Sequence, residues 1–113
     1  MNIQIFGTKK SSDARKAERW FKERRIKFQY INLAEKGLSK GELNSVAQAC
    51  GGLKELIDPQ AKDGYALALV QHTPDSMLLD KLLENQQVLR QPIVRNGRQA
   101  TVGYAPEVWK SWE

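Results

Sequence analysis

The segment from Gly7 to Asp13 has the residue types and the position of a small-anion binding loop. It joins an expected strand to the first turn of an expected helix, where unpaired backbone N–H groups and the positive end of the helix dipole favour a bound anion. Lys9, Lys10 and Arg15 add positive charge. The same residues also suit a helix capped by a hydroxyl and flanked by solvated lysines, and the loop taken alone favours this second interpretation.

Thiol and metal chemistry have few candidate residues in this sequence. Cys50 is the only cysteine, so no internal disulfide can form, and no Cys/His cluster offers a metal site. Cys50 continues an apolar stripe with Leu43, Val46 and Ala47 at helical spacing, which predicts a small buried side chain rather than a reactive thiol. His72, the only histidine, is expected at the surface. We therefore expect no metal and no resident cofactor.

The chain has 113 residues and a net charge of +5, enough for one domain with its own core. No apolar run approaches the length of a membrane span, and the N-terminus lacks the pattern of a signal peptide, so we expect a cytoplasmic protein without membrane contact. Sequence-specific nucleic-acid binding is not expected, because no aromatic platform is interleaved with the charges. Many basic residues instead form one solvated helix face: Arg15, Lys16, Arg19, Lys22, Arg24, Arg25 and Lys27.

The first third of the chain predicts a strand, a helix and a second strand, at residues 2–6, 12–25 and 27–33. A helical crossover between two strands favours parallel pairing. The N-cap of this helix is expected at Ser11, Ser12 or Asp13.

The middle of the chain predicts helices. Ser39 and Glu42 have the spacing of a capping box, and Gly51-Gly52 ends the helix that they begin. A short helical turn is expected at 53–57, and residues 60–71 give no clear pattern. Thr73-Pro74 predicts an N-cap with Pro at the first helical position. The helix that follows would end near Asn85 and turn four leucines toward the core: Leu78, Leu79, Leu82 and Leu83.

The last third predicts a hairpin and a terminal helix. Ile93-Val94 and the strand ending at Val102 flank Asn96-Gly97, a pair that suits a type I′ turn. The final helix begins near Pro106. Two strands alone do not form a stable sheet, so the first two must join the hairpin. The sequence therefore predicts an α/β fold in which a helical segment, residues 34–90, is inserted into a four-stranded mixed sheet with the order βαβ…ββα.

The chain resembles the arsenate reductase/Spx family along essentially its whole length. The similarity includes IFGTKKSSDARKAERWFKERRIKFQYINL, LSKGEL, GGLKELID, LLENQQVLRQPIVRNG and VGYAPEVWKSW. It implies a single domain, residues 1–113, with a thioredoxin-like part (1–33 and 91–113) and an inserted helical subdomain (34–90). It also implies that the Gln91–Pro92 peptide bond is cis.

Only some of the functional residues that this resemblance implies are present in the chain. Members that reduce arsenate or sense disulfide stress have a nucleophilic cysteine where this chain has Ser11, and members with a CxxC pair have the second cysteine at Ala14. A serine hydroxyl is far too weak an acid to replace that thiolate. Arsenate reductases have an arginine before the cis-proline, and here that residue is Gln91. The expected binding residues are Lys10, Ser12, Arg15, Arg90 and Pro92, with Arg90 still reaching the pocket.

Two functions follow from the resemblance. The first is a non-catalytic binding or regulatory protein with a protein partner, as Spx-type regulators bind RNA polymerase, or with a small anion or thiol as ligand. Trp109 and Trp112 would then form an exposed aromatic end, although such a pair also suits the core side of a terminal helix. The alternative is an arsenate reductase-like oxidoreductase, coupled to glutathione or thioredoxin, whose nucleophilic cysteine is replaced in this chain by Ser11. Glutathione would be its co-substrate.

Overall fold

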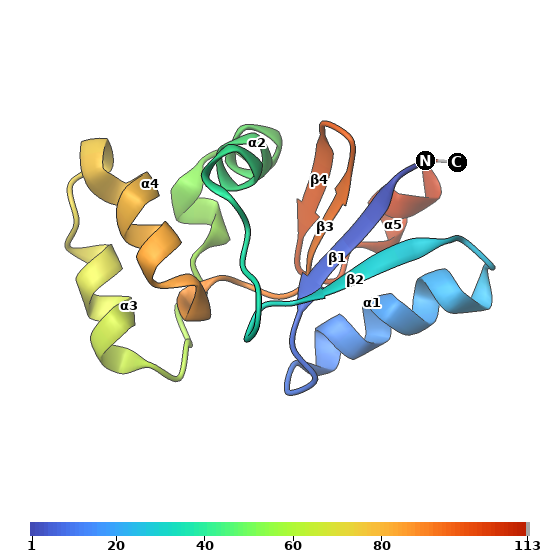
Figure 1. Cartoon of the computed structure of the whole chain (residues 1–113), viewed down its shortest axis with the longest axis horizontal. Helices are drawn as coiled ribbons and strands as arrows, with labels where there is room; N and C mark the ends of the chain where they lie inside the picture. Colours follow the sequence, from blue (N-terminus) through green and yellow to red (C-terminus); the bar gives the residue numbers. More distant parts are fainter. Residues whose placement is uncertain (113) are drawn as a thin grey trace.

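Four strands form one mixed sheet in the order β2–β1–β3–β4 (Figure 1). The computed structural model describes residues 1–112. The strands are β1 (Ile3–Gly7), β2 (Phe28–Asn32), β3 (Ile93–Asn96) and β4 (Gln99–Val102). β1 pairs with β2 in parallel and with β3 antiparallel, and β3 pairs with β4 antiparallel. The late hairpin therefore completes the sheet that the first two strands begin, as the sequence predicts.

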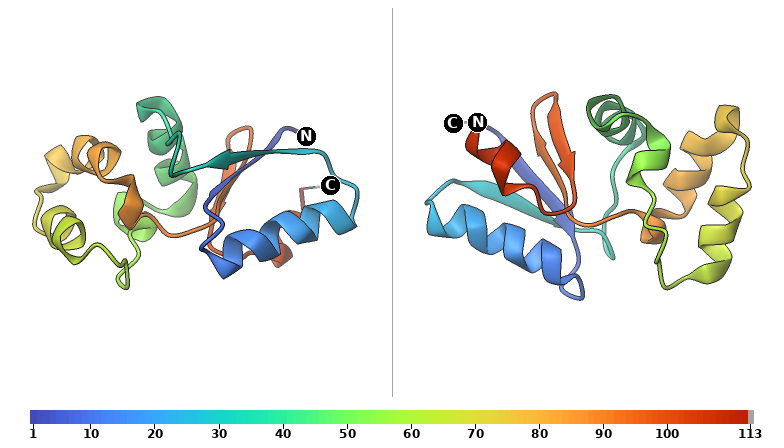
Figure 2. Two further views of the ribbon diagram at one scale, coloured as in Figure 1. Left: turned by 60° about the horizontal axis from the view of Figure 1, so that its bottom comes forward. Right: turned by 180° about the vertical axis from the view of Figure 1, so that it is seen from behind.

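The alternation of side chains along β1 separates the core into two clusters on opposite faces of the sheet. Ile3 and Ile5 pack on one face with helices α1 (Ser12–Glu23) and α5 (Pro106–Lys110). Phe6 points to the other face and joins the cluster formed with the remaining helices. Figure 2 shows α1 running along its face of the sheet. Gly7, the last residue of β1, leads directly into the loop before α1.

Helix α1 is shorter than the predicted range of 12–25. It ends at Glu23, with Arg24 as C-cap, and Arg25 has a φ of 58°, a left-handed backbone that ends the helix. The buried face of α1 consists of Ala14, Ala17, Trp20 and Phe21.

The segment between β2 and β3 contains α2 (Lys40–Cys50), η1 (Leu53–Leu56), α3 (Gly64–Gln71), α4 (Asp75–Glu84) and η2 (Gln86–Val88). α2 lies next to β4, and α3 and α4 lie farther from the sheet (Figure 1). The capping box of Ser39 and Glu42 forms as predicted. Residues 60–71, which give no clear sequence pattern, include helix α3, whose N-cap is Asp63.

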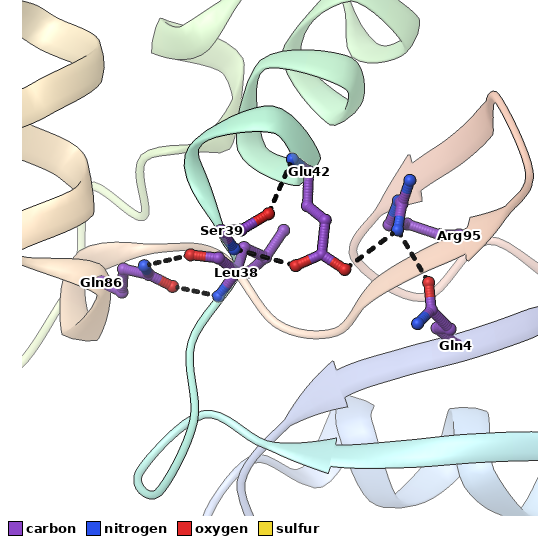
Figure 3. Close-up of polar contacts among 6 residues, drawn as sticks. All are labelled: Gln4, Leu38, Ser39, Glu42, Gln86 and Arg95. Atoms are coloured by element: carbon purple, nitrogen blue, oxygen red, sulfur yellow. Dashed lines mark hydrogen bonds and ion pairs between the residues drawn. The ribbon is translucent and has the colours of Figure 1, made fainter.

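A polar network joins α2 to the sheet (Figure 3). Arg95 of β3 donates from Nη1 to Oε1 of Gln4 at 2.8 Å and to Oε2 of Glu42 at 3.3 Å. The other carboxylate oxygen of Glu42 accepts the backbone N–H of Ser39 at 2.8 Å. Close by, the Gln86 amide bonds both the N–H and the carbonyl of Leu38, each at 2.8 Å. The start of α2 is therefore held by Arg95 of β3 and Gln86 of η2, and Gln4 of β1 in turn bonds Arg95.

Two local predictions are wrong. Pro74, not Thr73, is the N-cap of α4, and the Thr73 hydroxyl instead donates to the carbonyl of Leu69 in the preceding turn. The hairpin turn has Gly97 and Arg98 as its central residues, because Asn96 still pairs with Gln99. Only Gly97 has a positive φ, 62°, which is the pattern of a type II′ turn and not of type I′.

The two tryptophans near the C-terminus do not form an exposed end. Trp109 and Trp112 are only 1% and 9% exposed and belong to the cluster with α1. The indole N–H of Trp109 donates to the hydroxyl of Thr101 at 2.8 Å, which satisfies the one polar group of a buried ring. This aromatic pair is core packing. Within residues 1–112, no helix is long and apolar enough to cross a membrane.

Candidate functional site

Ser11 is the N-cap of α1. Its hydroxyl oxygen accepts the backbone N–H of Ala14 at 3.1 Å, and its own N–H donates to the carbonyl of Thr8 at 3.1 Å. Of the three N-cap candidates in the sequence, Ser11 has this role. The hydroxyl at this position therefore satisfies one of the free N–H groups of the first turn.

A cavity of about 630 Å³ lies beside this helix end. One wall is the loop before α1 with the first residues of the helix, and the opposite wall is the segment 58–63. The cavity brings together three of the predicted site residues, Lys10, Ser11 and Ser12. The other lining residues are Thr8, Asp13, Asp58, Gln60, Ala61, Lys62, Asp63, Gln87, Leu89 and Gln91.

Gln91 fastens the loop to the residue before β3. Its Oε1 accepts the backbone N–H of Thr8 at 2.7 Å and the hydroxyl of Thr8 at 3.1 Å. The Gln91–Pro92 peptide bond is cis, as the family resemblance implies. Pro92 is buried and outside the cavity lining, and its carbonyl accepts the N–H of Gly103 at 2.8 Å.

The two predicted arginines do not line this cavity. Arg15 lies on the exposed side of α1, and its guanidinium donates to the carbonyl of Lys9. Arg90, which the resemblance implies at the pocket, is absent from the lining of the Ser11 cavity and lines a second cavity. Leu89 and Gln91 both line the Ser11 cavity, and the residue between them points the opposite way because side chains alternate along an extended backbone.

Asp58 and Asp63, two acidic residues of the cavity wall, are absent from the sequence prediction of the site. Asp63 caps α3 by accepting the N–H of Ala66 at 3.0 Å, and its second oxygen accepts from the Gln87 amide at 3.1 Å. These hydrogen bonds lower the pKa of Asp63 below its ordinary value. Asp58 accepts the N–H of Gln60 at 2.9 Å, a local turn that its place before Pro59 already favours.

Formal charges on the cavity wall do not favour an anion. Lys10 and Lys62 contribute two positive charges, and Asp13, Asp58 and Asp63 contribute three negative ones. Among residues 1–112, no group of three or more His, Cys, Asp or Glu side chains is arranged to hold a metal ion. The arrangement suits hydrogen bonding to a polar ligand of mixed charge.

Cys50 lies away from this cavity. It is half-buried rather than fully buried as predicted, with its sulfur 3.6 Å from the carbonyl of Ala100. Burial raises the pKa of the Cys50 thiol, so the neutral form predominates at neutral pH. Tyr30, whose hydroxyl approaches Gly7, also has a raised pKa, chiefly through burial and then through the nearby charge of Glu18.

Proteins of similar sequence align with nearly the whole chain. The global transcriptional regulator Spx 2 of Oceanobacillus iheyensis is 30% identical over 106 residues, which cover 92% of this chain and 78% of that protein. The global transcriptional regulator Spx of Streptococcus pyogenes serotype M1 is 26% identical over 104 residues, covering 90% and 78%.

Solved structures share the fold. An ArsC family related protein from Bacteroides fragilis superposes with a TM-score of 0.86 at 20% identity, covering 100% of this chain and 98% of that one. An arsenate reductase from Vibrio cholerae gives 0.81 at 24% identity, covering 98% and 97%. The sheet with its helices is therefore the thioredoxin-like architecture of these proteins. The model of the ArsC family matches residues 6–112, and the chain belongs to the ArsC family.

Proposed function

We propose that this chain is a non-catalytic member of the ArsC family that acts by binding a partner. The observation that carries the proposal is the hydrogen bond from the Ala14 N–H to the Ser11 hydroxyl. Ser11 is the residue that corresponds to the nucleophilic cysteine, and here its oxygen caps a helix. An alcohol has no accessible anion at neutral pH, and the only histidine, His72, is absent from the cavity lining.

The composition of the cavity supports the same conclusion. An oxyanion such as arsenate needs an excess of positive charge or of arginine forks around it. Three carboxylates outnumber two lysines here, and Gln91 directs its acceptor oxygen to Thr8. The cavity is therefore unsuited to recruiting arsenate. It suits instead a polar group of a protein partner or of a small thiol ligand.

The surface of α1 supports a partner with an acidic face. Residues 9–27 contain nine Lys or Arg and three Asp or Glu, an excess of six, whereas the whole chain has an excess of five. The positive charge of the protein is therefore concentrated on this one segment, and most of its basic side chains are exposed. Curated relatives are global transcriptional regulators, which favours a regulatory role with a protein partner.

The alternative is an arsenate reductase-like oxidoreductase with a replaced nucleophile. It is favoured by the cavity, which still brings Lys10, Ser11 and Ser12 to the start of a helix next to a cis-proline. In this alternative, glutathione or thioredoxin would supply the electrons, and a cysteine at position 11 would suffice to restore turnover.

The test compares Ser11→Cys with Ser39→Cys, both in a Cys50→Ala background so that each protein has a single thiol. Ser39 is a matched control, because it is also an N-cap serine and accepts the N–H of Glu42 at 3.2 Å, but it lies outside the cavity. The pKa of each thiol is measured from its alkylation rate across pH. Glutathione- and thioredoxin-coupled reduction of arsenate and of a disulfide is then assayed in both variants and in the unmodified chain.

We expect no turnover in any form and no greater lowering of the thiol pKa at position 11 than at position 39. Turnover in Ser11→Cys with a lowered pKa would replace the proposal with the silenced-enzyme alternative. Turnover in the unmodified chain would overturn the proposal outright, because its only thiol is Cys50, which is half-buried and outside the Ser11 cavity.

A further inference from the structure

The second cavity has an apolar floor and a positively charged rim. Its volume is about 400 Å³, within the range of small-molecule sites. Ile57 and Pro59 supply the accessible apolar surface, and the buried Val70 and Leu78 close the base of the cavity. Lys54 and Arg90 supply the charge. Gln71 and Thr73 add polar groups, and no Asp or Glu of the described chain lines it.

Arg90 is held in place at this rim. Its backbone N–H donates to the carbonyl of Leu56 at 2.8 Å, and its side-chain Nε donates to the carbonyl of Ile57 at 3.2 Å. The terminal nitrogens of the guanidinium make no hydrogen bond to any residue in 1–112, and the side chain is exposed. A guanidinium fixed through Nε presents the remaining N–H groups as a fork that matches a carboxylate.

We propose that this cavity binds a small carboxylate with an apolar body, the carboxylate bonded by Arg90 and the apolar body covering Ile57 and Pro59. Lys54 is the second cation of the site. Its present partner is Asp75 at 3.2 Å, in a pair whose side chains are 73% and 81% exposed, and a pair this exposed is weak enough for a ligand carboxylate to replace. The site is separate from the Ser11 cavity and does not depend on the function proposed for it.

The experiment titrates isotope-labelled protein with 4-phenylbutyrate up to ~10 mM, a range that detects the millimolar affinities expected of a ligand this small. Backbone amide shifts identify the site. The alcohol 4-phenylbutan-1-ol tests the need for the carboxylate, and butyrate tests the need for the apolar body. The variant Arg90→Gln removes the fork, and Arg98→Gln, at an exposed position of the hairpin turn, is the control with the same change of charge.

We expect saturable shifts of the amides at residues 57, 71 and 73, a loss of affinity of about tenfold or more in Arg90→Gln, and wild-type affinity in Arg98→Gln. The alcohol and butyrate should each bind at least about tenfold more weakly. Arg90→Lys, which keeps the charge and loses the fork, should fall between wild type and Arg90→Gln. Absence of shifts, shifts confined to the Ser11 cavity, or equal binding by Arg90→Gln or by the alcohol would overturn the proposal.

Discussion

Gln91 and Thr8, 83 positions apart in the chain, are joined by two hydrogen bonds to a single oxygen. Oε1 of Gln91 accepts from the backbone N of Thr8 at 2.7 Å and from its hydroxyl at 3.1 Å. The residue before β3 therefore fixes the loop before α1. These two hydrogen bonds occupy the side-chain oxygen of Gln91, so this oxygen is not free to accept a hydrogen bond from a ligand in the Ser11 cavity.

Replacing Gln91 by Ala should destabilise the protein, because the N–H of Thr8 loses its acceptor in a partly buried loop. We expect a loss of about 1–2 kcal/mol in the free energy of unfolding, measured by urea denaturation. Gln48→Ala on the exposed side of α2 is the control and should change stability by less than about 0.5 kcal/mol. Equal stability of the two variants would mean that water replaces the Gln91 oxygen without cost.

The ion pair of Arg95 and Glu42 should contribute more to stability than the surface pairs. The two side chains are 17% and 29% exposed, and Nε of Arg95 is buried without a hydrogen-bond partner in the described residues. Glu42→Gln leaves the guanidinium charge uncompensated, so we expect a loss of about 2 kcal/mol in the free energy of unfolding.

A double-mutant cycle separates this pair from other effects. Arg95→Met combined with Glu42→Gln should cost less than the sum of the single changes, because the second change removes the charge that the first leaves unpaired. The control is Lys40→Met, which breaks an exposed pair with Asp80 at 3.1 Å and should cost no more than about 1 kcal/mol. Additivity in the cycle would show that the two side chains do not interact energetically.

Most of the element order, the parallel pairing of β1 with β2 and the β3–β4 hairpin could be predicted from the sequence, because they depend on local patterns. Each of these patterns spans only a few residues. The alternation of Ile3 and Ile5 indicates the first strand, the capping box at Ser39 indicates the start of α2, and the Asn96-Gly97 pair indicates the hairpin. Helix α3 and the antiparallel pairing of β1 with β3 could not be predicted, because the first has no clear pattern and the second joins residues about ninety positions apart. The exact turn geometry could not be predicted, because Asn96 takes part in the ladder and so moves the turn by one residue.

The composition of the site depended on tertiary placement. Asp58, Lys62 and Asp63 lie about fifty residues from Ser11 in the sequence, and only packing of the helical segment against the α1 loop brings them together. The direction of the Arg90 side chain could not be predicted either, because either Arg90 or Gln91 of this extended segment could face the loop before α1. The family resemblance identifies Gln91 as the residue before the cis-proline. Only the folded structure shows that the Gln91 side chain faces the Ser11 cavity and the Arg90 side chain faces the second cavity.

The stability contribution of Asp63 should depend on pH. Its pKa is lowered in the folded protein by the N–H of Ala66 and then by the Gln87 amide, so folding favours the ionised form. This contribution is present above the ordinary aspartate pKa of about 4 and is lost as the pH falls through the lower pKa of the folded state. Asp63→Asn keeps a capping oxygen and removes the charge.

Asp63→Asn should therefore be less stable than wild type at neutral pH, and the difference should disappear at acid pH where wild-type Asp63 is also uncharged. Urea denaturation at several pH values measures it. The matched control is Asp80→Asn, at an exposed position of α4. A difference between Asp63→Asn and wild type that does not change with pH would contradict a lowered pKa.

The close approach of Gly7 to Ala14 should make the end of β1 intolerant of any side chain. A Cβ atom at Gly7 would lie 2.7 Å from the Cβ of Ala14, a distance that forces the strand and the helix apart. We expect Gly7→Ala to cost about 1–3 kcal/mol. Gly41→Ala is the control with the same chemical change: nothing lies within 4 Å of its added Cβ, and alanine favours the helix, so its stability should rise.

The double variant Gly7→Ala with Ala14→Gly tests whether this contact is the cause. Ala14→Gly alone should cost about 1 kcal/mol, because glycine lowers helix propensity and leaves a small space. The double variant should lose less stability than the sum of the losses in the two single variants, because removing the Cβ of Ala14 makes room for the Cβ added at Gly7. Additive costs would place the strain elsewhere, against the Tyr30 hydroxyl at 3.2 Å, because the Gln91 oxygen at 3.5 Å is at ordinary contact distance. Tyr30→Phe combined with Gly7→Ala would then recover part of the lost stability.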